Sequence, residues 1–131
     1  MSGHLAILIF EALLGLFTAY AAYSLFSGTP ASIAKSREAL GIGRWYWLLA
    51  GTVATIGAAG LFVGLAVPVV GASAALWMVC YFIVATLTHV THRDMKNAGL
   101  PLIFLLVCAA LAALRWSDFA PALALITPFI P

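Results

Sequence analysis

Apolar residues run in four long stretches along the chain, at about residues 4–26, 45–64, 68–90 and 99–114. A transmembrane helix needs roughly 20 consecutive, mostly apolar residues, and each stretch approaches that length. Helix-ending or polar segments separate the stretches, beginning with Ser27-Gly28-Thr29-Pro30 after the first. The pattern predicts an all-α integral membrane protein, with four transmembrane helices in an up-and-down bundle that forms one domain over residues 1–131.

The first connection carries the signals of a further, short helix. Thr29 suits an N-cap, Pro30 the first helical position and Gly41 a C-terminal cap. Ile33 and Leu40 fall on one face of such a helix. We expect a short amphipathic helix lying at the membrane surface; a plain loop is the alternative.

The other connections are simpler. The turn before Pro68 is so short that the second and third helices must be antiparallel neighbours. The tail over residues 117–131 is apolar but contains three prolines, so it is too short and too broken for a fifth span. We expect it to lie at the interface or to cover a groove.

Charged residues make up 8% of the chain, against about 25% in ordinary globular domains. No Asp, Glu, Lys or Arg occurs between Trp45 and His92. The net charge of +2 is too small to indicate a nucleic-acid partner, so the expected partner is the lipid bilayer. Five of the six basic residues flank the first and third connections, which the positive-inside rule places in the cytoplasm. We therefore expect a bacterial inner (plasma) membrane protein with both termini on the outer side.

Glu11 is the exception to this charge pattern, because it lies inside the first stretch, roughly 10 Å below its outer end at helical rise. An ionised carboxyl in lipid costs several kcal/mol, so the side chain should be protonated or paired. At helical rise, the positions on the other spans at the depth of Glu11 include no basic residue. Arg115 is expected to extend outward to the interface. Trp77 or Ser73 is the expected hydrogen-bond donor to Glu11. Its role is either functional (a proton relay, ligand contact or catalytic acid/base) or purely structural.

His89 and His92 lie three residues apart at the inner end of the third stretch and share a helical face. A metal site needs further ligands from a second element, and the neighbouring helices offer Tyr20 and Tyr46 instead, so we predict no metal. Two readings remain: these residues bind a polar-headed ligand such as a quinone or lipid, or the histidines are ordinary interfacial side chains.

Small residues occupy one face of the second stretch, at Gly57, Gly60 and Gly64. Such spacing lets helices approach closely. The contact is either within the bundle or between subunits of a homo-oligomer, and a ligand groove over the glycines is a further interpretation.

The order of several small and charged positions resembles the DoxX-like family of small four-span membrane proteins. The resemblance runs from about residue 24 to residue 115 and rests on Lys35, Leu40-Gly41, Gly51, Gly57 to Gly60, Gly64, Pro68, Ala74-Ala75, Ala85, His89 and Arg115. It implies a compact four-helix bundle and a loose association with oxidoreductase systems, some of them quinone-linked. Many members have a Glu three residues after the glycine that matches Gly51, where this chain has Ala54.

These observations leave three function hypotheses. The first is an accessory subunit of a larger membrane complex, associated with a redox or quinone-linked system. The second is a membrane enzyme that acts on a lipid-soluble substrate, with Glu11 as the catalytic acid/base. The third is an assembly factor or chaperone that offers its glycine face to partner helices.

Overall fold

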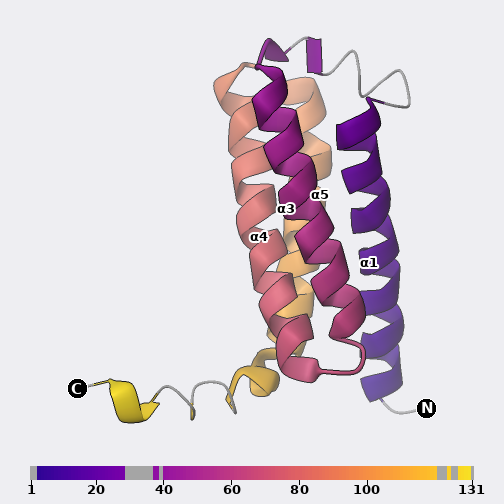
Figure 1. Ribbon diagram of the computed structural model, residues 1–131, viewed down its shortest axis with the longest axis vertical. Coiled ribbons are helices and arrows are strands. Elements are labelled where there is room, and N and C mark those ends of the chain that lie inside the picture. Colours follow the sequence, from indigo (N-terminus) through magenta and orange to yellow (C-terminus); the bar gives the residue numbers. More distant parts are fainter. Residues whose placement is uncertain (1–2, 29–36, 39, 121–123, 125–126, 131) are drawn as a thin grey trace.

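The computed structural model describes residues 3–28, 37–38, 40–120, 124 and 127–130, and all regular structure in these residues is helical. Four long helices form the body of the protein (Figure 1): α1 (Gly3–Ser27), α3 (Arg44–Val63), α4 (Pro68–Thr91) and α5 (Met95–Leu114). Two short 3₁₀ helices follow, η1 (Trp116–Phe119) and η2 (Thr127–Phe129). The predicted all-α architecture with four long apolar helices is confirmed.

The helices run up and down beside one another (Figure 1). α1 packs on α3, α3 on α4 and α4 on α5, whereas α1 and α5 have few contacts with each other. We call the end that holds the α1–α3 and α4–α5 connections the connection end. The opposite end, with the start of α1, the α3–α4 turn and the end of α5, is the terminal end.

All four helices are long and apolar enough to cross a membrane, at 25, 20, 24 and 20 residues. At 1.5 Å per residue, 20 residues span about 30 Å, which is the thickness of the hydrocarbon core. Only 22–33% of each candidate span is buried within the protein. Large apolar side chains such as Leu16, Ile83 and Leu106 instead point outward, and each is 43–64% exposed. The chain is therefore an integral membrane protein whose outer surface contacts lipid.

Most serine and threonine hydroxyls on the helices bond a carbonyl of their own helix. Thr18, Thr52, Ser73, Thr86 and Thr88 each donate to the carbonyl four residues earlier, at 2.7–2.8 Å. Because lipid offers no hydrogen-bond partner, this local bond satisfies the hydroxyl and lets it lie within the membrane.

Three helices begin and end within one residue of the predicted spans, but α5 begins at Met95, four residues before the predicted start at residue 99. The sequence predicts its polar first turn as part of the connection between the third and fourth helices. A helix can extend beyond the lipid with polar residues, and Asn97 bonds Asp94 across this turn. The predicted amphipathic helix falls mainly on residues 29–36 and 39, outside the described residues, and stays a prediction.

The half of the bundle toward the terminal end is tightly packed. Leu61, Met78, Cys108 and Leu111 are completely buried there. All three glycines singled out on α3 meet α4: Gly57 faces Met78, Gly60 faces Ala74, and Gly64 faces the backbone of Gly71. A side chain at Gly64 would overlap that backbone, so the close approach of α3 and α4 requires glycine at this position.

Candidate functional site

A cavity of about 790 Å³ lies toward the connection end, with walls from all four long helices. Its walls are mainly apolar and include Phe17, Ala50, Val53, Ala85 and Phe104. Phe17 and Leu49 line the cavity and are also exposed at the protein surface, so the cavity opens sideways toward lipid. The volume and lining are typical of a site for an apolar molecule of drug size.

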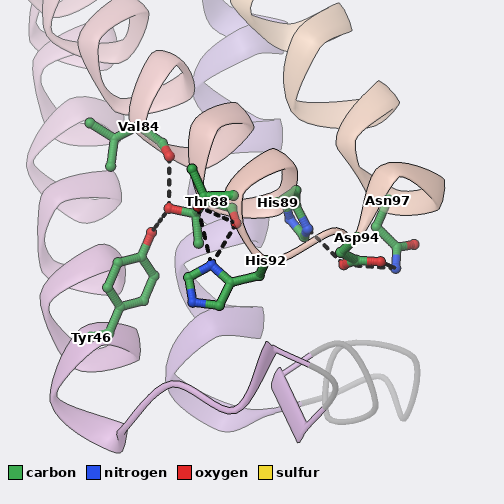
Figure 2. A network of polar contacts seen from close by, with 8 residues as sticks. Tyr46, Val84, Thr88, His89, His92, Asp94 and Asn97 are labelled. Carbon is green, nitrogen blue, oxygen red and sulfur yellow. Dashed lines mark hydrogen bonds and ion pairs between the residues drawn. The ribbon is translucent and has the colours of Figure 1, made fainter.

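Polar side chains gather at the connection end of this cavity, where Tyr46, Thr88 and His89 are part of its lining. The hydroxyls of Tyr46 and Thr88 are 2.6 Å apart and join α3 to α4 (Figure 2). The Thr88 hydroxyl also donates to the carbonyl of Val84 at 2.8 Å. Because a hydroxyl has one proton, Tyr46 must donate to Thr88.

His89 is held by a carboxylate from the start of α5. Its Nδ1 lies 2.8 Å from Oδ2 of Asp94, and both side chains are about five-sixths buried. The amide Nδ2 of Asn97 bonds both carboxylate oxygens of Asp94 at 2.9 and 3.1 Å. This arrangement fixes the orientation of the imidazole, as carboxylate partners commonly do.

The backbone turn at the end of α4 places the Asp94 side chain beside the imidazole of His89. The amide of Asp94 donates to the carbonyl of His89 at 2.7 Å, and that of Arg93 donates to Val90 at 3.1 Å. These two bonds are those of a Schellman motif, in which the residue just after the helix C-cap has a left-handed backbone conformation. Arg93 takes that conformation, with φ of 57°.

His92 turns to a different partner. Its Nδ1 lies 2.8 Å from the carbonyl oxygen of Thr88, its ring is exposed, and it does not line the cavity (Figure 2). The two histidines therefore do not form a joint ligand pair, although they lie three residues apart. Within the described part of the chain, no cluster of three or more His, Cys, Asp or Glu side chains is placed to hold a metal ion.

Glu11 lies at the other end of the bundle and has a cationic partner, contrary to the prediction. Nη2 of Arg115 is 3.0 Å from Oε2 of Glu11, and Nε is 3.3 Å from Oε1. Both residues are buried, at 0% and 2% exposure. Arg115 also reaches Asp118 at 3.3 Å and the carbonyl of Gly64 at 3.5 Å. A two-pronged contact of this kind is the strong form of the Arg–carboxylate pair.

Two glycines make room for this ion pair. A Cβ on Gly71 would lie 2.5 Å from Oε1 of Glu11, too close for any side chain. Gly71 is in turn pressed against Gly64, whose carbonyl is one of the partners of Arg115. The start of α4 and the end of α3 therefore shape the space for the Glu11 carboxylate.

The prediction for Arg115 is wrong for an identifiable reason. An arginine at a helix end usually extends its long side chain toward water. Here the end of α5 turns into η1, with the amide of Asp118 donating to the carbonyl of Arg115 at 2.9 Å. This turn directs the guanidinium inward, where a carboxylate compensates its charge. The position of Glu11 and Arg115 at the same end of the bundle is the signal in the sequence that indicates the pair.

The other predicted partners of Glu11 bond elsewhere. Trp77 donates from Nε1 to the carbonyl of Val53 at 2.9 Å, and Ser73 donates to Val69 at 2.8 Å. Trp77 lines the cavity, together with the predicted candidates Tyr20, Tyr46 and His89, whereas Glu11, Ser73 and His92 do not. Thr88, Asn97 and Lys96 are not predicted as site residues by the sequence, since single hydroxyl, amide and amine side chains near a helix end are common.

Comparison with protein families agrees with the early resemblance. The profile described as the DoxX-like family matches residues 9–111, which is most of the chain and includes all or most of each long helix. Comparison with curated proteins and with solved structures gives no match. The four apolar helices and this match together place the chain in the DoxX-like family of membrane proteins.

Proposed function

We propose that this protein holds a lipid-soluble molecule in the cavity between its four helices, as an accessory subunit of a membrane redox or quinone-linked system. The observation that carries the proposal is the cavity itself, which is apolar along its walls and polar at one end. A molecule with an apolar body and a polar head group matches that distribution. The association with redox systems that the family resemblance implies favours a quinone-like occupant.

The geometry around Glu11 supports an accessory role better than an enzymatic one. A catalytic acid/base must reach the reacting atoms of a substrate. Glu11 is fully buried, is held by Arg115 and lies outside the cavity lining. We therefore assign Glu11 a structural role, and the carboxyl-based enzyme hypothesis has no support from its surroundings.

The proposal is tested by purifying the protein from native membranes into lipid nanodiscs and identifying bound small molecules by mass spectrometry. The informative variant is Ala85→Phe, which places a ring in the cavity that Ala85 lines. Its matched control is Ala110→Phe, because Ala110 is exposed on α5 and does not line the cavity.

We expect a lipid-soluble molecule to accompany the wild type and the Ala110→Phe variant and to be lost from Ala85→Phe. Equal retention by both variants would place the molecule outside the cavity and refute the binding proposal. The accessory role is checked in the same preparations: it requires that a larger membrane complex with redox components co-purifies, and a chain isolated alone after gentle crosslinking contradicts it.

A further inference from the structure

The hydrogen bonds at the polar end of the cavity have a fixed direction, and that direction constrains what can bind there. A hydroxyl or imidazole that has already given its proton to the protein can offer a ligand only a lone pair. Counting protons therefore shows whether the site presents donors or acceptors. This inference rests on the proposed function, since it assumes that the cavity has an occupant.

Tyr46 presents an acceptor. Thr88 gives its proton to the Val84 carbonyl, so Tyr46 gives its own proton to Thr88 (Figure 2). The Tyr46 oxygen retains lone pairs, and Tyr46 lines the cavity. A ligand group next to this oxygen must donate to it.

His89 also presents an acceptor. An ionised carboxylate only accepts hydrogen bonds, so Nδ1 of His89 carries the proton of the bond to Asp94. In a neutral imidazole the other nitrogen, Nε2, is then an acceptor. Asn97 follows the same logic: its Nδ2 faces Asp94, so its carbonyl oxygen is the acceptor that remains. Both residues line the cavity.

The remaining polar groups narrow the choice of head group. Lys96 lines the cavity as well, but it is an exposed residue. Its ammonium only donates hydrogen bonds, so it disfavours an ammonium head group and leaves the acceptors at Tyr46 and His89 as the groups that favour a donor. The hydroxyls of Tyr20 and Tyr81 can donate or accept, so they suit any polar ligand. Trp77 already donates its single N–H to the carbonyl of Val53, so it has no donor left for a ligand.

We infer that the end of the cavity at Tyr46 and His89 selects a neutral head group that donates hydrogen bonds, namely a hydroxyl carried by an apolar body. Phenols and quinols have such a group. An ether or a fully oxidised quinone of the same shape has only acceptors, and would face acceptors at Tyr46 and His89. Within a quinone-linked system, the reduced form is therefore the preferred occupant.

The test compares two probes that differ only in the donor, para-decylphenol and its methyl ether, with the full-length protein in nanodiscs at about pH 8, where an imidazole is ordinarily neutral. Affinities are corrected for partition into empty nanodiscs. We expect the phenol to bind about three- to tenfold more tightly, the difference that one or two ordinary hydrogen bonds make. Decyl hydroquinone, kept under nitrogen, should exceed decyl benzoquinone in the same way.

Two variants reverse the polarity without removing the cavity. Thr88→Val frees the proton of Tyr46, and Asp94→Asn allows the His89 proton to move to Nε2. Each should strengthen binding of the methyl ether and reduce the preference for the phenol. His92→Phe is the control, because His92 lies outside the lining, and it should keep the wild-type preference.

The outcomes separate the two proposals. Binding of the ether or the benzoquinone as tight as that of its hydroxyl partner overturns the donor rule while leaving an occupied cavity. An equal loss of affinity for both probes in the two variants also overturns it, because a structural defect has that effect. If no probe binds the wild type above empty nanodiscs, the proposed function itself fails and the donor rule with it.

Discussion

Arg115 and Glu11 are separated by 104 positions in the chain, and their side chains meet at 3.0 Å in the interior of the bundle. The pair joins the end of α5 to α1, two helices that otherwise have few contacts. The opposite charges of the two side chains also compensate each other in the protein interior, where both are buried. The contact therefore closes the bundle at its terminal end, opposite the cavity.

Removal of the Glu11 carboxylate should destabilise the protein strongly. Glu11→Ala leaves Arg115 buried with less compensation, and breaking a buried pair in this way costs about 3–5 kcal/mol. The double variant Glu11→Leu, Arg115→Leu should cost clearly less than the sum of the two single changes. Thermal unfolding in nanodiscs compares Glu11→Ala, the two single Leu variants and the double variant, and additive losses in the Leu variants would show that the two residues do not interact.

Gly71→Ala should also destabilise, because the new methyl group would displace the Glu11 carboxylate. The control is Gly99→Ala on α5, where a Cβ meets nothing within 4 Å. Alanine favours helix over glycine by about 1 kcal/mol, so this control should be neutral or stabilising. The same unfolding assay compares the two variants, and similar effects of both would contradict the tight space assigned to Gly71.

Trp77→Phe should weaken the contact between α3 and α4. The change removes the indole N–H that donates to the Val53 carbonyl, a bond worth about 1 kcal/mol. Trp45→Phe serves as the comparison, because Trp45 is 66% exposed and, among the described residues, its indole donates no hydrogen bond to another helix. Equal stability of the two variants would argue against a role for the Trp77 bond.

Arg93 is in a left-handed conformation, at φ of 57°, at the end of α4. Glycine adopts this conformation without strain, whereas a β-branched residue does so at the greatest cost. Arg93→Gly should therefore raise stability slightly, and Arg93→Val should lower it by about 1–2 kcal/mol. If Arg93→Val were more stable than Arg93→Gly in an unfolding experiment, the left-handed conformation of Arg93 in the Schellman motif would be excluded.

The two cysteines should differ in their reaction with a small lipid-soluble maleimide. Cys80 is exposed and lines the cavity, whereas Cys108 is fully buried in the packed half. We expect labelling of Cys80 alone, slowed when a ligand fills the cavity. Mass spectrometry of Cys80→Ser and Cys108→Ser variants assigns the label, and rapid modification of Cys108 would contradict the packing of that half.

The membrane architecture follows from the sequence because each span is an uninterrupted apolar stretch of the necessary length. The start of α5 was the exception, since the periodicity of a polar first turn does not distinguish helix from loop. The physical reason is that Lys96 and Asn97 need no burial, because backbone bonds and the side-chain bond between Asn97 and Asp94 support the helix there.

The site was only partly predictable. Tyr46 and His89 are candidates for ligand binding from their position at the ends of apolar spans, and both line the cavity. Trp77 also lines it, although the sequence predicts it as a donor to Glu11 and its indole instead bonds Val53. The cavity itself depends on how four helices diverge, which no local pattern encodes. Arg115 was misplaced because its direction depends on the turn into η1 and on a carboxylate 104 positions away.

The distance along the chain between Glu11 and Arg115 also has a consequence in time. Ribosomes add about 5–20 residues per second, so Glu11 emerges roughly 5–20 s before the arginine that will neutralise it. During that interval the first span must enter the bilayer with its carboxyl protonated or hydrated. The residue that follows α5 thus completes the charge balance of α1, and a chain truncated before Arg115 lacks this partner for Glu11.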